Sequence, residues 1–137
     1  MLATQTACLG LAGVIAIAFG LRYMFATQFL EYHAVVAGHT WGELPPGLQA
    51  VVLGMYTILG GGFITYGAAL LWLLLPLRDE EHWAALAALT LTVTSLVPVI
   101  YVTVWLRRVQ PAARTPVVPA VVVFVLAVVG AGVSLLP

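Results

Sequence analysis

The side chains that could do chemistry gather in one stretch between two long apolar runs. Residues 25–45 read FATQFLEYHAVVAGHTWGELP and carry two of the three histidines and two of the five acids. Imidazole and carboxylate groups can bind metal ions or exchange protons. The candidate ligand or metal site in this stretch consists of Glu31, His33, His39, Trp41 and Glu43.

The spacing of these residues argues against a metal centre. In a continuous helix, the four-residue step from His39 to Glu43 would put both side chains on one face, while His33 would lie about 120° away. One imidazole and one carboxylate are too few ligands for a zinc or iron site. Gly38 and Gly42 also weaken the helix on which the pairing depends. We therefore expect no metal and no other cofactor, and we identify no catalytic residue.

The elements that must position this stretch are apolar. Of the 137 residues, 63% are hydrophobic and 7% are charged, and the formal net charge is zero. A soluble domain carries about 25% charged residues, so this composition predicts an integral membrane protein of the all-α class. It offers no basic block for nucleic acid.

Four apolar stretches are each long enough to cross a bilayer as a helix. They predict a single transmembrane domain over residues 1–137, built as a four-helix bundle with a short interfacial helix after the first span. The expected spans are residues 6–24, 48–75, 83–106 and 117–136.

Small residues recur at every fourth position in the first two spans. Such stripes let two helix backbones approach closely in a membrane, which predicts a tight antiparallel pair. Alanine and glycine are also common in membrane spans without this role. The stripe of the first span is Cys8, Ala12, Ala16 and Gly20, and that of the second is Thr57, Gly61, Thr65 and Ala69.

Prolines and acids mark expected kinks and helix ends. Pro98 removes a backbone hydrogen bond inside the third span and predicts a kink there. Pro76 is expected to end the second span. Asp79 is expected to cap the third span, with Glu80 and Glu81 in its first turn.

The arginines suggest an orientation. Because successive spans alternate in direction, the first and third connections share one side, with Arg22, Arg107, Arg108 and Arg114. Only Arg78 lies at the opposite side. The positive-inside rule then predicts that both termini are outside the cell membrane.

The run MYTILGGGFITYGAALLWLLLP at residues 55–76 and the Tyr32–His33 region resemble small bacterial DoxX-like membrane proteins. That group includes proteins implicated as membrane partners of redox enzymes. The resemblance implies a location in the bacterial inner membrane, and no catalytic residue is carried over from it.

Three functions are consistent with these patterns. The first is a non-enzymatic accessory, assembly or partner-binding subunit of a larger membrane complex, surrounded by the lipid bilayer and bound to copies of itself or to another membrane protein. The second is a small membrane enzyme or redox component with its site at residues 25–46. The third is an oligomeric carrier or channel for small solutes, which needs a polar path along Thr90, Thr94, Ser95 and Tyr101. Scarce polar groups and two small-residue stripes favour the first.

Overall fold

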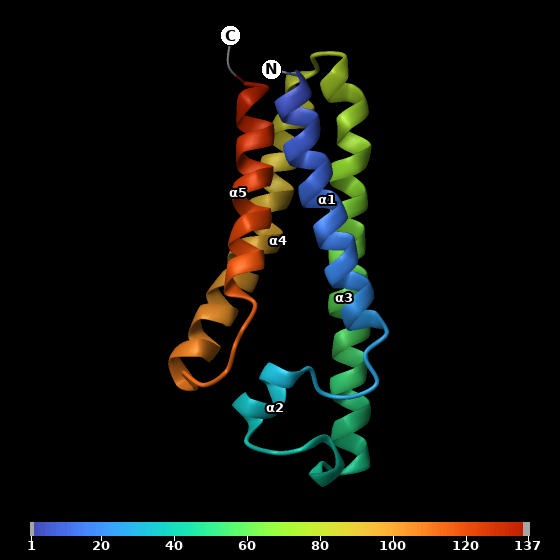
Figure 1. Cartoon of the computed structure of the whole chain (residues 1–137). Helices are drawn as coiled ribbons and strands as arrows, with labels where there is room; N and C mark the ends of the chain where they lie inside the picture. The colour runs from blue at the N-terminus through green and yellow to red at the C-terminus, as the bar shows by residue number, and fades with distance from the viewer. Residues whose placement is uncertain (1, 136–137) are drawn as a thin grey trace.

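The computed structural model describes residues 2–135, and these residues form five α-helices and one short 3-10 helix (Figure 1). The all-α class is thus confirmed. Residue 136, where the fourth span was expected to end, lies outside the described residues. The elements are α1 (Leu2–Met24), α2 (Glu31–Ala37), η1 (Trp41–Glu43), α3 (Pro46–Arg78), α4 (His82–Val109) and α5 (Val117–Val133).

The four longer helices pack in a ring. Helix α1 lies between α3 and α5, and α4 completes the ring by contacting both α5 and α3. Figure 1 shows the two ends of the described chain at one end of the molecule. Helix α2 and the turn between α4 and α5 lie at the opposite end, where the α4–α5 pair spreads away from α1 and α3.

Three of these helices, α1, α3 and α4, are long and apolar enough to cross a membrane. Helix α5 is also apolar but has 17 residues, which gives it a length of about 26 Å. Large apolar side chains are exposed on all four helices, as expected where lipid replaces water. Examples are Val14, Ile58, Trp72, Val97 and Val118.

Helices α1 and α3 form the closest contact in the ring, and glycines make it. A Cβ atom added to Gly60 would lie 2.6 Å from the carbonyl oxygen of Gly20. One added to Gly67 would lie 2.5 Å from the carbonyl oxygen of Gly13. The earlier glycine of α1, Gly13, meets the later glycine of α3, Gly67, so the two helices are antiparallel.

The α3 side of this contact differs from the expected stripe. Thr57 and Thr65 are exposed, Ala69 is half-buried, and a Cβ on Gly61 would meet only the Met24 side chain, at 3.9 Å. Four-residue steps drift around a helix by about 40° each, whereas seven-residue steps, such as Gly60 to Gly67, drift by only about 20°. A straight contact therefore follows the seven-residue spacing.

On α1 most of the expected stripe faces the interior. Ala12, Ala16 and Gly20 are buried, and Cys8 is half-buried. Gly13, which lies outside the stripe, also contacts α3. The four-residue pattern thus found the buried face of α1 and one of its two glycine contacts with α3, Gly20, but not the other, Gly13.

The turn between α3 and α4 is tighter than expected. Helix α3 continues through Pro76 to Arg78, and Asp79 is its C-terminal cap residue. Helix α4 starts after Glu81 without a side-chain cap or an acid in its first turn. The expectation that Asp79 caps α4 is wrong, because the two additional residues of α3 leave only three residues between the helices.

Helices α3 and α4 are joined by a buried pair of hydroxyl groups. The Thr92 hydroxyl donates to the carbonyl oxygen of Ala88 at 2.7 Å and lies 3.0 Å from the Tyr66 hydroxyl. Thr90, Thr94 and Tyr101 are instead exposed on α4. Within one chain, these three residues do not form an interior polar path.

Candidate functional site

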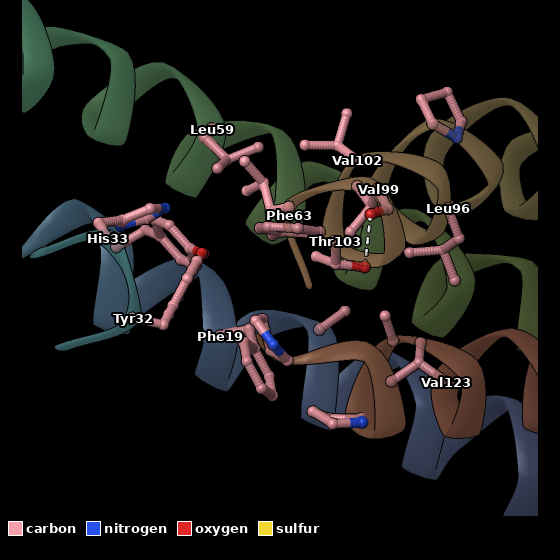
Figure 2. A pocket seen from close by; sticks show the side chains of 17 residues that line it. Phe19, Tyr32, His33, Leu59, Phe63, Leu96, Val99, Val102, Thr103 and Val123 are labelled. Carbon is pink, nitrogen blue, oxygen red and sulfur yellow. Dashed lines mark hydrogen bonds between the residues drawn. The ribbon is translucent and has the colours of Figure 1, made fainter. Parts of the chain in front are cut away.

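A cavity of about 320 Å³ lies inside the ring of helices, toward the end that carries α2 (Figure 2). We call it the central cavity. Its wall is almost wholly apolar, and its volume is within the range of small-molecule sites. The Thr103 hydroxyl donates to the carbonyl oxygen of Val99 at 2.9 Å, so its proton is used within α4. Typical wall residues are Phe19, Phe63, Leu96, Val102, Pro98 and Val123.

Three tyrosines and a histidine form a cluster at one end of this cavity, and we call it the Tyr–His cluster. Tyr32 and His33 of α2 line the cavity. The Tyr32 hydroxyl is hydrogen-bonded to that of Tyr23 on α1, and His33 Nδ1 is hydrogen-bonded to the Tyr56 hydroxyl on α3. The ring centroids of Tyr32 and His33 are 3.9 Å apart, and those of Tyr23 and Tyr56 are 5.4 Å apart. The cluster thus fastens α2 over the cavity.

The antiparallel register explains why Tyr56 reaches this end. The glycine contacts place Tyr56 level with Met24, the last residue of α1. Helix α3 has 33 residues against 23 in α1, so its first ten residues extend past α1. Figure 1 shows α2 lying beside this extension.

Burial sets the protonation of the cluster residues on α2. It lowers the pKa of His33 from 6.5 to about 4, so the imidazole is neutral at pH 7. It also raises the pKa of Tyr32. The backbone N–H of Leu30 donates to the Tyr56 oxygen at 3.5 Å. Tyr56 can then donate its own proton to His33 Nδ1, which leaves the imidazole proton on Nε2 as a donor.

A second, more polar cavity of about 570 Å³ adjoins the first. We call it the polar vestibule. It contains Arg22, Glu31, Arg114 and Thr115. The two cavities are adjacent, since five residues contribute to the lining of both. The shared residues are Phe19, Tyr23, Tyr32, Pro116 and Pro119.

The five candidate residues from the sequence do not meet at one point. His33 lines the central cavity and Glu31 lines the polar vestibule. Helix α2 ends at Ala37, and its C-terminal cap residue Gly38 has a φ of +67°, so the continuous helix that would pair His39 with Glu43 does not form. His39 is exposed, with Nδ1 2.9 Å from the carbonyl oxygen of Ala37.

The last two candidates shape the connection to α3. Glu43 accepts a hydrogen bond from the Thr40 backbone N–H at 2.6 Å, and this bond lowers the Glu43 pKa. Trp41 packs edge-on against Phe29, with ring centroids 5.2 Å apart. Within residues 2–135, no three His, Cys, Asp or Glu side chains are grouped closely enough to hold a metal ion.

The sequence missed Tyr23 and Tyr56 as partners of His33. Both lie in apolar runs, where a tyrosine hydroxyl needs a partner or an interface position. Two features of the sequence could have indicated them. Tyr23 lies at the end of the first span, and the second apolar run is longer than a bilayer requires. A long run can extend past its neighbour and bring an internal tyrosine level with the connecting segment.

Comparisons with protein-family models, with curated proteins and with solved structures gave no significant match. The function of this chain is therefore inferred from the site itself. Its parts are an apolar chamber, a hydrogen-bonding cluster at one end, and a charged vestibule beyond. This combination suits a molecule with an apolar body and a polar end.

Proposed function

We propose that this chain is a small, non-enzymatic membrane protein that binds one lipophilic molecule between its helices. In this proposal, α1, α3, α4 and α5 all cross the membrane, and α2 lies at the interface. The chain acts as an accessory subunit that holds the molecule for a larger membrane complex. The observation that carries the proposal is the apolar central cavity with the Tyr–His cluster at one end.

The location is proposed on separate grounds. Four of the five arginines lie in or beside the connections at the α2 end, which supports a cytoplasmic position for this end and outside termini. The DoxX-like resemblance supports the bacterial inner membrane.

The polar groups of the site favour binding over chemistry. Tyr23, Tyr32, His33 and Tyr56 are hydrogen-bonded in pairs, and the imidazole is neutral at pH 7. Such groups can orient the polar end of a ligand. The apolar wall would accept the hydrocarbon part of the ligand and exclude water from it.

A cavity-filling substitution tests the proposal. Ala120 lines the central cavity on α5, so Ala120→Phe places a ring in the space assigned to the ligand. Val122 is two residues away on the same helix and is 44% exposed, so Val122→Phe adds a ring on the outer side. Each protein is extracted gently from its own membrane, examined by native mass spectrometry, and its bound molecules are identified after solvent extraction.

The expected result is one lipophilic molecule per chain in the unmodified protein and in Val122→Phe, and its loss in Ala120→Phe. Equal retention in both variants, or an empty unmodified protein, would contradict the proposal. A stable protein partner that copurifies only with the ligand-loaded form would support the accessory role.

A further inference from the structure

The two adjacent cavities differ in chemical character. The central cavity is apolar, and the polar vestibule begins at the residues that the two share. A ligand that occupies both would place an apolar part in the central cavity and a polar part in the vestibule.

The charges in the vestibule favour an anion. Arg22 comes from the last turn of α1 and Arg114 from the connection before α5, while Glu31 contributes the single acid among the lining residues. Arginine binds carboxylate and phosphate groups through charge-assisted hydrogen bonds.

A buried hydroxyl supplies a second, independent observation. Thr115 lines the vestibule and is only 8% exposed, yet its Oγ1 has no hydrogen-bond partner among residues 2–135. Buried polar atoms without partners are rare in folded proteins, and each calls for an explanation. The Oγ1 atom is itself shielded from solvent, and rotation about the Cα–Cβ bond would bring it to a headgroup oxygen in the vestibule as its acceptor.

We infer that the ligand is an anionic amphiphile, with its hydrocarbon chain in the central cavity and its carboxylate or phosphate headgroup in the vestibule between Arg22 and Arg114. This inference rests on the proposed function, because it names the ligand class of the same site. Anionic lipids supply both headgroups within the bilayer, and basic pockets between membrane helices suit them.

Matched probes separate the headgroup from the chain. The protein is placed in nanodiscs of phosphatidylcholine, and binding of radiolabelled palmitate, palmitoyl lysophosphatidate, hexadecanol and inorganic phosphate is measured against empty nanodiscs. Palmitate and palmitoyl lysophosphatidate are expected to bind at least about tenfold more tightly than hexadecanol, since hydrogen bonds between charged groups are stronger than those of a neutral hydroxyl. Inorganic phosphate is expected not to bind, because it lacks the chain.

Variants assign the headgroup contacts. Arg22→Gln and Arg114→Gln are each expected to weaken the two anionic probes about tenfold and to leave hexadecanol within about twofold. Thr115→Val is expected to weaken the anionic probes by a smaller factor. Arg107 is exposed at the end of α4 and does not line the vestibule, so Arg107→Gln serves as the matched control.

The outcomes distinguish this inference from the function on which it rests. If hexadecanol binds as tightly as palmitate and the arginine variants change nothing, while Ala120→Phe abolishes binding, the ligand is neutral and the inference is wrong. If the anions bind to the Ala120→Phe variant unchanged, the site is a surface charge patch and the inference also fails. If no probe with a chain binds at all, the proposed function fails with it.

Discussion

The imidazole of His33 and the phenol of Tyr56 are hydrogen-bonded across 23 positions of sequence, and this bond joins α2 to α3 beside the central cavity. Helix α2 makes few backbone contacts with the four longer helices. Its position therefore depends on the side chains of the Tyr–His cluster.

Loss of the Tyr56 hydroxyl is expected to loosen α2. In Tyr56→Phe the hydrogen bonds to His33 and to the Leu30 backbone disappear. Since a typical hydrogen bond contributes about 1 kcal/mol, the free energy of local unfolding of α2 is expected to fall by about that amount. Amide hydrogen exchange over Glu31–Ala37 is expected to become about fivefold faster. Tyr101→Phe, at a site that is 70% exposed, provides the control. Unchanged exchange in Tyr56→Phe would show that α2 is held by something else.

Burial of His33 predicts that stability falls in mild acid. The pKa is about 4 in the folded protein and 6.5 ordinarily, so the unfolded chain binds more protons between these values. Stability is then complete above about pH 6.5 and is lost as the pH falls toward 4. Without screening, this shift would make the folded protein about 2 kcal/mol less stable at pH 5 than at pH 7, and solvent screening of the partly exposed ring reduces this loss to about 1 kcal/mol.

The measurement is thermal unfolding in detergent at pH 7 and pH 5. His33→Gln keeps a hydrogen-bonding group beside Tyr56 but does not titrate, so its stability is expected to change less between the two pH values. His39→Gln, at an exposed position, is expected to behave like the unmodified protein. Identical pH dependence in His33→Gln and the unmodified protein would contradict the assignment.

The helices could be read from the sequence because their cause is local. A long apolar run without charges must be helical in a membrane, where every backbone group needs an internal partner. The helical connection was also foreseen in part, and His33 was among its candidate residues. The rotation of a helix about its own axis, by contrast, is not set locally. Gly60 and Gly61 point in directions about 100° apart, and a helix that is apolar on all sides does not indicate which of them faces α1.

The grouping of the candidate residues could not be read from the sequence for the same reason. His39 and Glu43 were paired by spacing along a helix that Gly38 interrupts. The partners of His33 lie on two other helices and became neighbours only through the glycine register of α1 and α3. Thr115 could not be recognised either, since its missing partner is a property of the packed structure.

Adjacent glycines in α3 are expected to respond in opposite ways to the same substitution. Gly60→Ala puts a Cβ 2.6 Å from the Gly20 carbonyl oxygen and 2.8 Å from the Met24 backbone nitrogen. Backbone cannot move aside as a side chain can, so we expect a loss of about 1–3 kcal/mol. Gly61→Ala meets only the end of the Met24 side chain at 3.9 Å, and it is expected to be neutral or to stabilise by up to about 1 kcal/mol.

Unfolding of the two variants in mixed micelles checks this difference, with Gly62→Ala as a third member because a Cβ there meets nothing within 4 Å. Equal stability in all three variants would remove the close contact assigned to Gly20 and Gly60.

The hydroxyl pair between α3 and α4 predicts an asymmetric double-mutant cycle. Because the Thr92 hydroxyl donates to Ala88, Tyr66 must donate to Thr92 Oγ1. Thr92→Val keeps the shape but leaves a phenol donor that is only 4% exposed without a partner, and we expect it to cost about 1–3 kcal/mol. Tyr66→Phe leaves Thr92 bonded to Ala88 and is expected to cost about 1 kcal/mol or less.

The double variant shows whether the two hydroxyl groups are coupled. Once Tyr66 has become Phe, Thr92→Val no longer strands a donor, so the second substitution is expected to cost less than it does alone. Chemical unfolding of the four proteins in detergent gives the coupling energy. Additive costs would mean that Tyr66 and Thr92 act independently, and the bond between them would then contribute nothing to holding α3 against α4.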